Sequence, residues 1–283
     1  MIKEWLAGYK PNNKDEAQSA LREIMQEVAL AGLYRGGFFE KAAFYGGTCL
    51  RIFYGLDRFS EDLDFSLLQS DPDFSLDKYM NAIRNEFEAL GMHVSIKDKK
   101  KAKHNHVDSA FLKSETIWKE LMLENIIPQN GLAQQPNIKI KIAVDTVPPG
   151  GFETEEKLLL QPFSFYVKCF SLPDLFAGKM HVLLFRKWKD NVKGRDWYDF
   201  EWYVKKGVPL NLKHFVVLAK ESGDIVTGQL TQNEFKKLLT ARINSVDMER
   251  VKADVVRFIP DGNKLDIWSR KYFIDLSGRL KLD

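Results

Sequence analysis

Two aspartates, Asp62 and Asp64, follow closely on a pair of glycines, Gly46 and Gly47. In a strand, the two carboxylates leave the same face, roughly 6.6 Å apart along the chain. They repel each other unless a positive charge lies between them, and a divalent cation is the usual solution. A glycine pair permits a tight turn whose backbone N–H groups point outward, as phosphate oxygens require. The two features together predict a site for phosphoryl or nucleotidyl transfer.

Segments 46–50 (Gly-Gly-Thr-Cys-Leu) and 58–65 (Arg-Phe-Ser-Glu-Asp-Leu-Asp-Phe) resemble the DNA-polymerase-β-like nucleotidyltransferase superfamily. Its mark is a Gly-Gly or Gly-Ser turn followed by Asp-x-Asp. Within that superfamily the two segments are similar to the AbiEii-type abortive-infection toxins. The resemblance implies an α+β nucleotidyltransferase fold, with a mixed β-sheet flanked by helices and then a C-terminal helical domain that completes the active site.

The same resemblance implies an activity and its partners. The expected enzyme is a metal-dependent toxin that transfers a nucleoside monophosphate from a nucleoside triphosphate (NTP) to RNA and releases pyrophosphate. The expected acceptor is tRNA. A cognate antitoxin is the expected protein partner, in a toxin–antitoxin system that serves in phage defence.

On this resemblance, phosphate binding falls to the glycine turn and to two hydroxyl groups. Gly46, Gly47, Thr48 and Ser60 are expected to hold the nucleotide phosphates. Capping the short helix after the turn is an equally good role for Thr48. The aspartate pair is expected to bind Mg²⁺, or Mn²⁺ in its place.

A third carboxylate, Asp145, ends residues 138–145, the most regularly alternating stretch of the chain. As a strand this stretch puts Asp145 on one face with Ala143 and Lys141. We interpret Asp145 as a third metal ligand or as a general base for a hydroxyl nucleophile. The alternative is a strand-end aspartate that accepts hydrogen bonds from turn N–H groups before Pro148. Many relatives carry a further acidic residue in place of Ala143, which leaves the second metal site an open question.

Lys179 lies in a strongly apolar helical segment. On a helix it is flanked by Leu175 and Phe176 one turn back, and by Val182 and Leu183 one turn on. Such a lysine must either extend to water or meet an anion. We favour a bound triphosphate as that anion, because the matching family segment also has a lysine here.

The segment Arg195-Asp196-Trp197-Tyr198-Asp199 resembles the family's closing motif, Arg-Asp-x-x-Asp at a helix start. Helical spacing lets Arg195, Asp196 and Asp199 share one face. Asp199 is expected to orient Lys179 or the nucleophile, Arg195 to contact phosphate, and Asp196 to take part in nucleotide binding. The structural alternatives are a helix-capping role for Asp196 and a plain ion pair between Arg195 and Asp199.

Periodicity and turn residues indicate the elements that position these groups. We predict a nucleotidyltransferase-fold domain over residues 1–170 and a helical domain over 171–283. The predicted strands are 38–45, 62–65, 92–96, 107–112, 138–145 and 163–170. The predicted helices are 14–33, 48–54, 76–90, 174–187, 195–205, 212–221, 231–245 and 248–258. Residues 115–131 are ambiguous, and a short helix is the favoured interpretation.

Residues 97–106 form a basic connector, Lys-Asp-Lys-Lys-Lys-Ala-Lys-His-Asn-His. A charge run of this kind is usually a solvated loop. The alternative is contact with an RNA backbone, where each phosphate neutralised steepens the salt dependence of binding.

Composition sets the broad class. The 283 residues are 45% hydrophobic and 29% charged, typical of a globular protein, and a net charge of +3 does not by itself indicate nucleic-acid binding. Cys49 and Cys169 match no metal-ligand spacing and indicate reduced thiols. We find no apolar run long enough to span a bilayer and no signal peptide, so we expect a cytoplasmic protein.

Two other function classes stay open at this point. One is a non-catalytic protein derived from this fold, which binds nucleotide or RNA and acts through a partner. Ala143 is the main argument for it. The other is a metal-dependent nuclease that uses the same aspartates.

Overall fold

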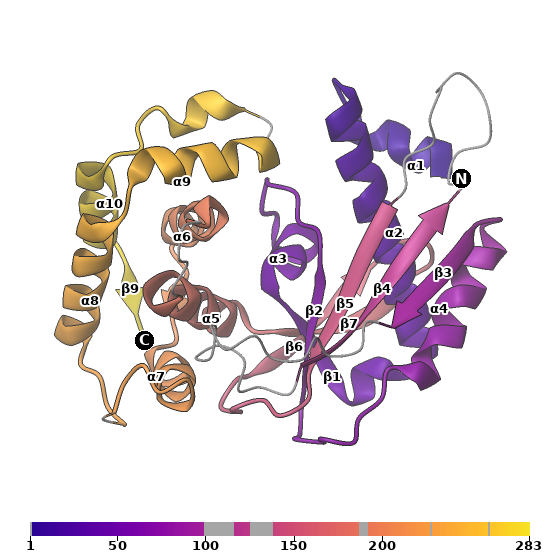
Figure 1. Ribbon diagram of the computed structural model, residues 1–283, viewed down its shortest axis with the longest axis horizontal. Helices are drawn as coiled ribbons and strands as arrows, with labels where there is room; N and C mark the ends of the chain where they lie inside the picture. Colours follow the sequence, from indigo (N-terminus) through magenta and orange to yellow (C-terminus); the bar gives the residue numbers. More distant parts are fainter. Residues whose placement is uncertain (1, 99–115, 125–137, 187–191, 227, 260) are drawn as a thin grey trace.

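The computed structural model describes residues 2–98, 116–124, 138–186, 192–226, 228–259 and 261–283. Its centre is a mixed seven-stranded sheet in the order β3-β4-β5-β2-β1-β7-β6 (Figure 1). The β1–β7 and β2–β5 pairs are parallel, and the other neighbours are antiparallel. The strands are β1 (Ala42–Tyr45), β2 (Leu63–Leu67), β3 (His93–Asp98), β4 (Thr116–Glu124), β5 (Ile138–Asp145), β6 (Thr154–Leu159) and β7 (Phe165–Phe170). The predicted α+β class with a mixed sheet is confirmed.

Strand β4 corrects one prediction. Residues 116–124, assigned above to a short helix, pair along their length with β5. Leu121 and Leu123 are fully buried, and alternate residues therefore face the core. Strand β6 was not predicted at all. The predicted strand 107–112 and nearly all of the basic connector 97–106 lie outside the described residues.

Helices from the first half of the chain cover the sheet on the side away from the C-terminal helices (Figure 1). They are α1 (Ile2–Tyr9), α2 (Lys14–Arg35) and α4 (Asp77–Ala89), with the short η1 (Phe38–Glu40) before β1. Helices α2 and α4 approach closely at Gly32, where an added Cβ would lie 2.5 Å from the Cα of Ile83. Helix α3 (Gly46–Tyr54) instead lies between the sheet and the C-terminal helices.

The C-terminal part is built of helices that stand opposite the sheet across α3 (Figure 1). Its elements are α5 (Leu172–Phe185), α6 (Gly194–Lys206), β8 (Pro209–Leu210), α7 (Leu212–Glu221), α8 (Gln232–Ser245), α9 (Met248–Val255), η2 (Val256–Phe258), η3 (Gly262–Leu265), α10 (Arg270–Ser277) and β9 (Lys281–Leu282). No described helix has both the length and the apolar character needed to cross a membrane.

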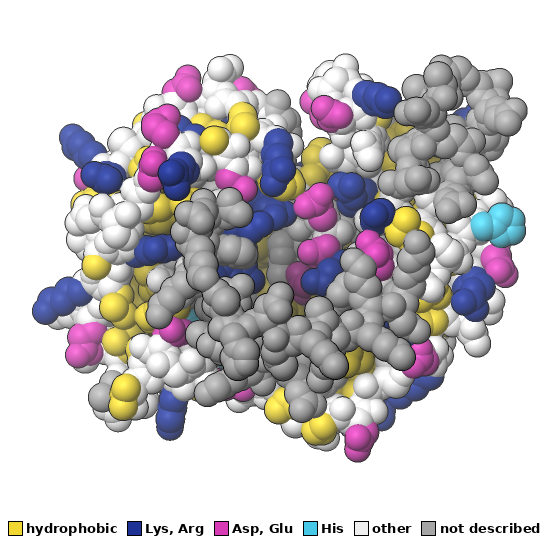
Figure 2. Space-filling view, in the orientation of Figure 1, with side chains coloured by type: hydrophobic (Ala, Val, Ile, Leu, Met, Phe, Trp, Pro, Cys, Tyr) yellow, Lys and Arg dark blue, Asp and Glu magenta, His cyan; other side chains and the backbone are white. Residues whose placement is uncertain are grey.

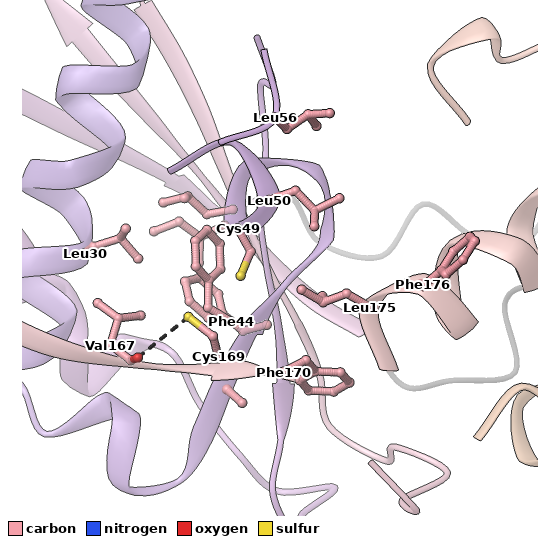
Figure 3. Packing of buried hydrophobic residues seen from close by; sticks show 14 of the residues in the cluster. Leu30, Phe44, Cys49, Leu50, Leu56, Val167, Cys169, Phe170, Leu175 and Phe176 are labelled. Carbon is pink, nitrogen blue, oxygen red and sulfur yellow. Dashed lines mark hydrogen bonds between the residues drawn. The ribbon is translucent and has the colours of Figure 1, made fainter. Parts of the chain in front are cut away.

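One hydrophobic cluster runs through both parts of the molecule. It contains Phe44 of β1, Phe170 of β7 and Leu175 of α5. Figure 3 shows Leu175 pointing toward this part of the core. The change from sheet to helices falls between Phe170 and Leu172. The division into two domains at residue 170 stays a prediction.

Candidate active site

A pocket of about 330 Å³ opens between the sheet and the C-terminal helices. Its lining is almost entirely polar, and Figure 2 shows basic and acidic side chains meeting in the central hollow. The carboxylates of this lining are Glu61, Asp62, Asp64 and Asp196, and its basic side chains are Arg58, Lys141, Lys179, Arg186, Lys193 and Arg195. This excess of cations over carboxylates suits an anionic ligand such as a polyphosphate.

The glycine turn opens helix α3 at the wall of this pocket. Gly46 has φ +83°, and a Cβ there would lie 2.9 Å from Oδ2 of Asp64. A Cβ on Gly47 would lie 2.9 Å from both Nη2 of Arg58 and Oγ of Ser60. Both positions therefore need glycine, the first for its backbone conformation and its space and the second for its space. The first backbone N–H groups of α3 lack helical partners, so an anion is favoured beside them.

We expect Gly46→Ala to lower transfer activity much more than stability. The positive φ should cost about 1–2 kcal/mol of unfolding free energy, and the new methyl group should displace the Asp64 carboxylate. The matched control is Gly91→Ala, because Gly91 has φ +73° but no atom within 4 Å of its added Cβ. Both variants should lose similar stability in urea titrations, and only Gly46→Ala should lose nucleotide transfer. Equal activity in the two variants would contradict this role of the turn.

Asp62 and Asp64 point from the β2 end of the sheet into the pocket. Burial and, after it, the neighbouring Asp62 charge raise the pKa of Asp64 to about 6, against the opposing charges of Lys141 and Lys179. Burial also raises the pKa of Asp62, which Lys141 partly offsets. Two carboxylates that are costly to ionise together are a suitable donor pair for a divalent cation. Among the described residues, no group of three His, Cys, Asp or Glu side chains is placed to hold a metal ion.

The raised pKa of Asp64 predicts a pH-dependent cost to stability. The unfolded chain releases this proton near pH 3.8 and the folded protein near pH 6, so the folded state binds more protons in between. Stability therefore falls as pH rises through this window. Without divalent cations, Asp64→Asn should be more stable than the wild type at pH 7.5, by about 1–2 kcal/mol for a partly solvated group. The gain should vanish near pH 4.

Urea titrations at pH 7.5 and pH 4 would measure this difference. The control is Asp73→Asn at an exposed position, which should change stability little at either pH. If Asp64→Asn is no more stable than the wild type at pH 7.5, the ionised Asp64 carboxylate does not destabilise the folded protein.

A chain of ion pairs joins Arg58, Asp199, Lys179 and Asp196 at the wall of the pocket. Arg58 donates two hydrogen bonds to Asp199, both 2.6 Å long, with the two side chains 2% and 0% exposed. Nζ of Lys179 lies 2.9 Å from the Asp199 carboxylate and 2.8 Å from that of Asp196. Burial alone would raise the pKa of Asp199, but Arg58 and Lys179 outweigh it and hold that pKa below its usual value. Burial likewise disfavours the Lys179 charge, but Asp196 and Asp199 outweigh it and raise the Lys179 pKa.

The structure therefore brings together most of the residues singled out from the sequence. Lys179, Asp196 and Arg195 line the same pocket as the Asp62–Asp64 pair. Arg195 lies 3.5 Å from Glu61 and its guanidinium stacks over Phe258. The carboxylate of Asp199 contacts both Arg58 and Lys179. Its expected role of orienting Lys179 or the nucleophile stays a prediction.

Two predicted residues are placed differently. Thr48 is the third residue of α3 and is buried, and its hydroxyl donates to the carbonyl oxygen of Asp62. It therefore positions the aspartate segment instead of facing the pocket. Asp145 pairs in register with Ser66 and Thr116, outside the pocket lining, and accepts a 3.1 Å hydrogen bond from the Val147 N–H. Its role as third ligand or base stays a prediction.

Several residues that line or support the pocket were not among the predicted site residues. Arg58 belongs to the motif segment, but a loop arginine gives no indication that it will be buried. Arg186 and Lys193, which flank a segment outside the described residues, also line the pocket. So does Glu61, which contacts Arg22 at 3.5 Å. Gln26 of α2 holds the loop by donating to the carbonyls of Ser60 and Glu61, at 3.2 and 2.9 Å. Gln26 lies among buried apolar residues of α2, such as Met25 and Val28, and a polar residue at such a position was the available indication.

Comparisons with known proteins identify the family of this chain and a similar fold. A family model described as "Nucleotidyl transferase AbiEii toxin, Type IV TA system" matches residues 28–274. No curated protein matches the sequence. A candidate nucleotidyltransferase from Helicobacter pylori has a similar fold, with a TM-score of 0.50, 14% identity and 92% of each chain covered.

Two further solved structures show weaker likeness. JHP933 from Helicobacter pylori gives a TM-score of 0.49 at 16% identity, covering 92% of this chain and 89% of that one. MenT4, a nucleotidyltransferase toxin from Mycobacterium tuberculosis, gives a TM-score of 0.45 at 14% identity, covering 99% of this chain and 98% of that one.

Proposed function

Since this chain belongs to the AbiEii family of nucleotidyl transferase toxins of type IV toxin–antitoxin systems, we propose that it transfers a nucleoside monophosphate from an NTP to RNA. The expected acceptor is tRNA, and the reaction depends on a divalent cation. The transfer acts in the cytoplasm and serves phage defence, opposed by a cognate antitoxin.

The observation that carries this proposal is the shared pocket of Asp62, Asp64 and Lys179. The three residues come from two segments more than a hundred positions apart, yet they meet beside the glycine turn that opens α3. The carboxylate pair suits a metal ion, and the cluster of cations suits the triphosphate that carries this ion. This supports an NTP as the substrate.

In the proposed reaction a hydroxyl oxygen of the acceptor attacks the α-phosphorus of the NTP. The new O–P bond forms as the bond from that phosphorus to the bridging oxygen breaks, and pyrophosphate leaves. Catalysis of this kind is mainly positioning and electrostatic stabilisation. The backbone of Gly46 and Gly47, with the Ser60 hydroxyl, would hold phosphate oxygens. Lys179 and Arg195 would neutralise charge on the triphosphate.

The carboxylates of Asp62 and Asp64 would hold the divalent cation, Mg²⁺ or Mn²⁺. The donor set fits one such ion, because Mg²⁺ is commonly bound by one or two carboxylates together with substrate phosphates and water. The ion when bound neutralises phosphate charge and polarises the P–O bonds.

The remaining predicted residues act on these groups. Asp196 and Asp199 fix the position of the Lys179 ammonium through their contacts of 2.8 and 2.9 Å. The proton of the attacking hydroxyl needs an acceptor, and Asp145 remains the residue predicted for that role.

Incubation of the purified protein and Mg²⁺ with total tRNA and each of four α-³²P-labelled triphosphates tests the proposal. Transfer of label to intact RNA is the expected result. Shortened RNA without label would indicate a nuclease instead. Unchanged RNA together with retained triphosphate binding would indicate a non-catalytic binding protein.

A further inference from the structure

Lys141 lies beside the two aspartates on the neighbouring strand. In the parallel β2–β5 pair, Asp64 is the register partner of Ala143, and Leu63 that of Ile142. Continuing this register by one residue puts Lys141 beside Asp62. Register partners point to the same face of a sheet, and Lys141 indeed lines the pocket with both aspartates.

This face of β5 offers no carboxylate at the positions next to the aspartate pair. A second divalent cation in a phosphoryl-transfer site needs carboxylate ligands on its far side. The residue opposite Asp64 is Ala143, which has no donor atom, and the one beside Asp62 is a cation. Asp145, two residues further along, lies outside the pocket and accepts the Val147 N–H.

The other carboxylates of the pocket are engaged by cations. Asp196 lies 2.8 Å from Nζ of Lys179. Glu61 lies 3.5 Å from both Arg22 and Arg195. Glu120 of β4 is the register partner of Lys141 on its other side, so Lys141 separates it from the aspartates. The donor set thus provides for one divalent ion, with the Lys141 side chain on the β5 side of it.

We propose that this site holds a single divalent cation and that Lys141 takes the place of a second one, binding the phosphate that is transferred. The inference rests on the proposed function, because it concerns the same NTP site. A lysine ammonium is a compact point charge and a common phosphate ligand. It neutralises developing charge beside the aspartates without needing carboxylate ligands of its own.

Two measurements test the inference. The first counts bound Mn²⁺ by electron paramagnetic resonance, with the α,β-methylene analogue of the triphosphate that labels RNA best. We expect one ion per wild-type chain and one per Lys141→Gln chain. The second is transfer at saturating NTP and Mg²⁺, where Lys141→Gln should lower kcat about a hundredfold and Lys141→Arg should restore part of it. The matched control is Lys139→Gln, an exposed lysine on the same strand face, which should leave both measurements unchanged.

Three outcomes would count against the inference. Two Mn²⁺ ions per wild-type chain, or wild-type kcat in a folded Lys141→Gln protein, would overturn it and leave the proposed function intact. A folded wild-type protein that neither binds the analogues nor labels RNA would overturn the proposed function as well. Urea midpoints of each variant separate a loss of chemistry from a loss of folding.

Discussion

Replacing Asp64 by asparagine is expected to lower nucleotide transfer at least about a hundredfold, the scale of losing one preorganised charge-stabilising group. Asn keeps the shape of the side chain but loses the charge that holds the cation against the triphosphate. Asp62→Asn should have a loss of similar size, because the two carboxylates form one donor pair. Label transfer from NTP to RNA under saturating Mg²⁺ would measure both, with the folded state of each variant checked by circular dichroism.

The control for this prediction is Asp73→Asn, at an exposed position away from the pocket. It should transfer label at the wild-type rate. Persistent labelling by both Asp62→Asn and Asp64→Asn would mean that the site lies elsewhere. Asp145→Asn belongs in the same series. A loss as large as that of Asp64→Asn would support the predicted role of Asp145 as ligand or base. Near-normal transfer would indicate that Asp145 serves only to accept the strand-end hydrogen bond from Val147.

Local patterns were enough to predict most of the elements. Residues 138–145 alternate strictly and form β5, and the segment after Asn13 forms α2, whose first turn this residue caps. Strand β4 was missed because its sequence carries consecutive apolar residues, Leu121 to Leu123, which suit a helix as well as a strand. Its pairing with β5 and with β3 decides the outcome, and such long-range pairing leaves little trace in a short window.

The candidate site was predictable where its chemistry is local. The aspartate pair and the glycine turn lie within twenty residues of each other. Lys179 could be selected because it is a charged residue in an apolar helical segment. The burial of Arg58 was not predictable, because its partner Asp199 lies 141 residues further along the chain. The position of Lys141 likewise follows from the register of β5 against β2, which the sequence alone does not fix.

The buried pair of Arg58 and Asp199 leads to the other large expected effect. Asp199→Asn should destabilise the protein by about 3–5 kcal/mol, because it leaves the buried Arg58 charge without its partner. It should also lower transfer, since Lys179 loses one of the two carboxylates that fix it. An exposed pair gives the comparison: Glu249→Gln, which removes the negative charge of the 3.1 Å ion pair with Lys252, should cost less than about 1 kcal/mol.

The double variant Arg58→Met/Asp199→Asn separates stability from chemistry. Removing the orphaned guanidinium should recover much of the lost stability in urea titrations, because no unpaired buried charge remains at that position. Transfer should stay low, because the Lys179 ammonium is still held by Asp196 alone. Recovery of transfer together with stability would show that Asp199 contributes only to folding. A cost of Asp199→Asn no larger than that of Glu249→Gln would show that the Arg58 pair does not anchor the pocket.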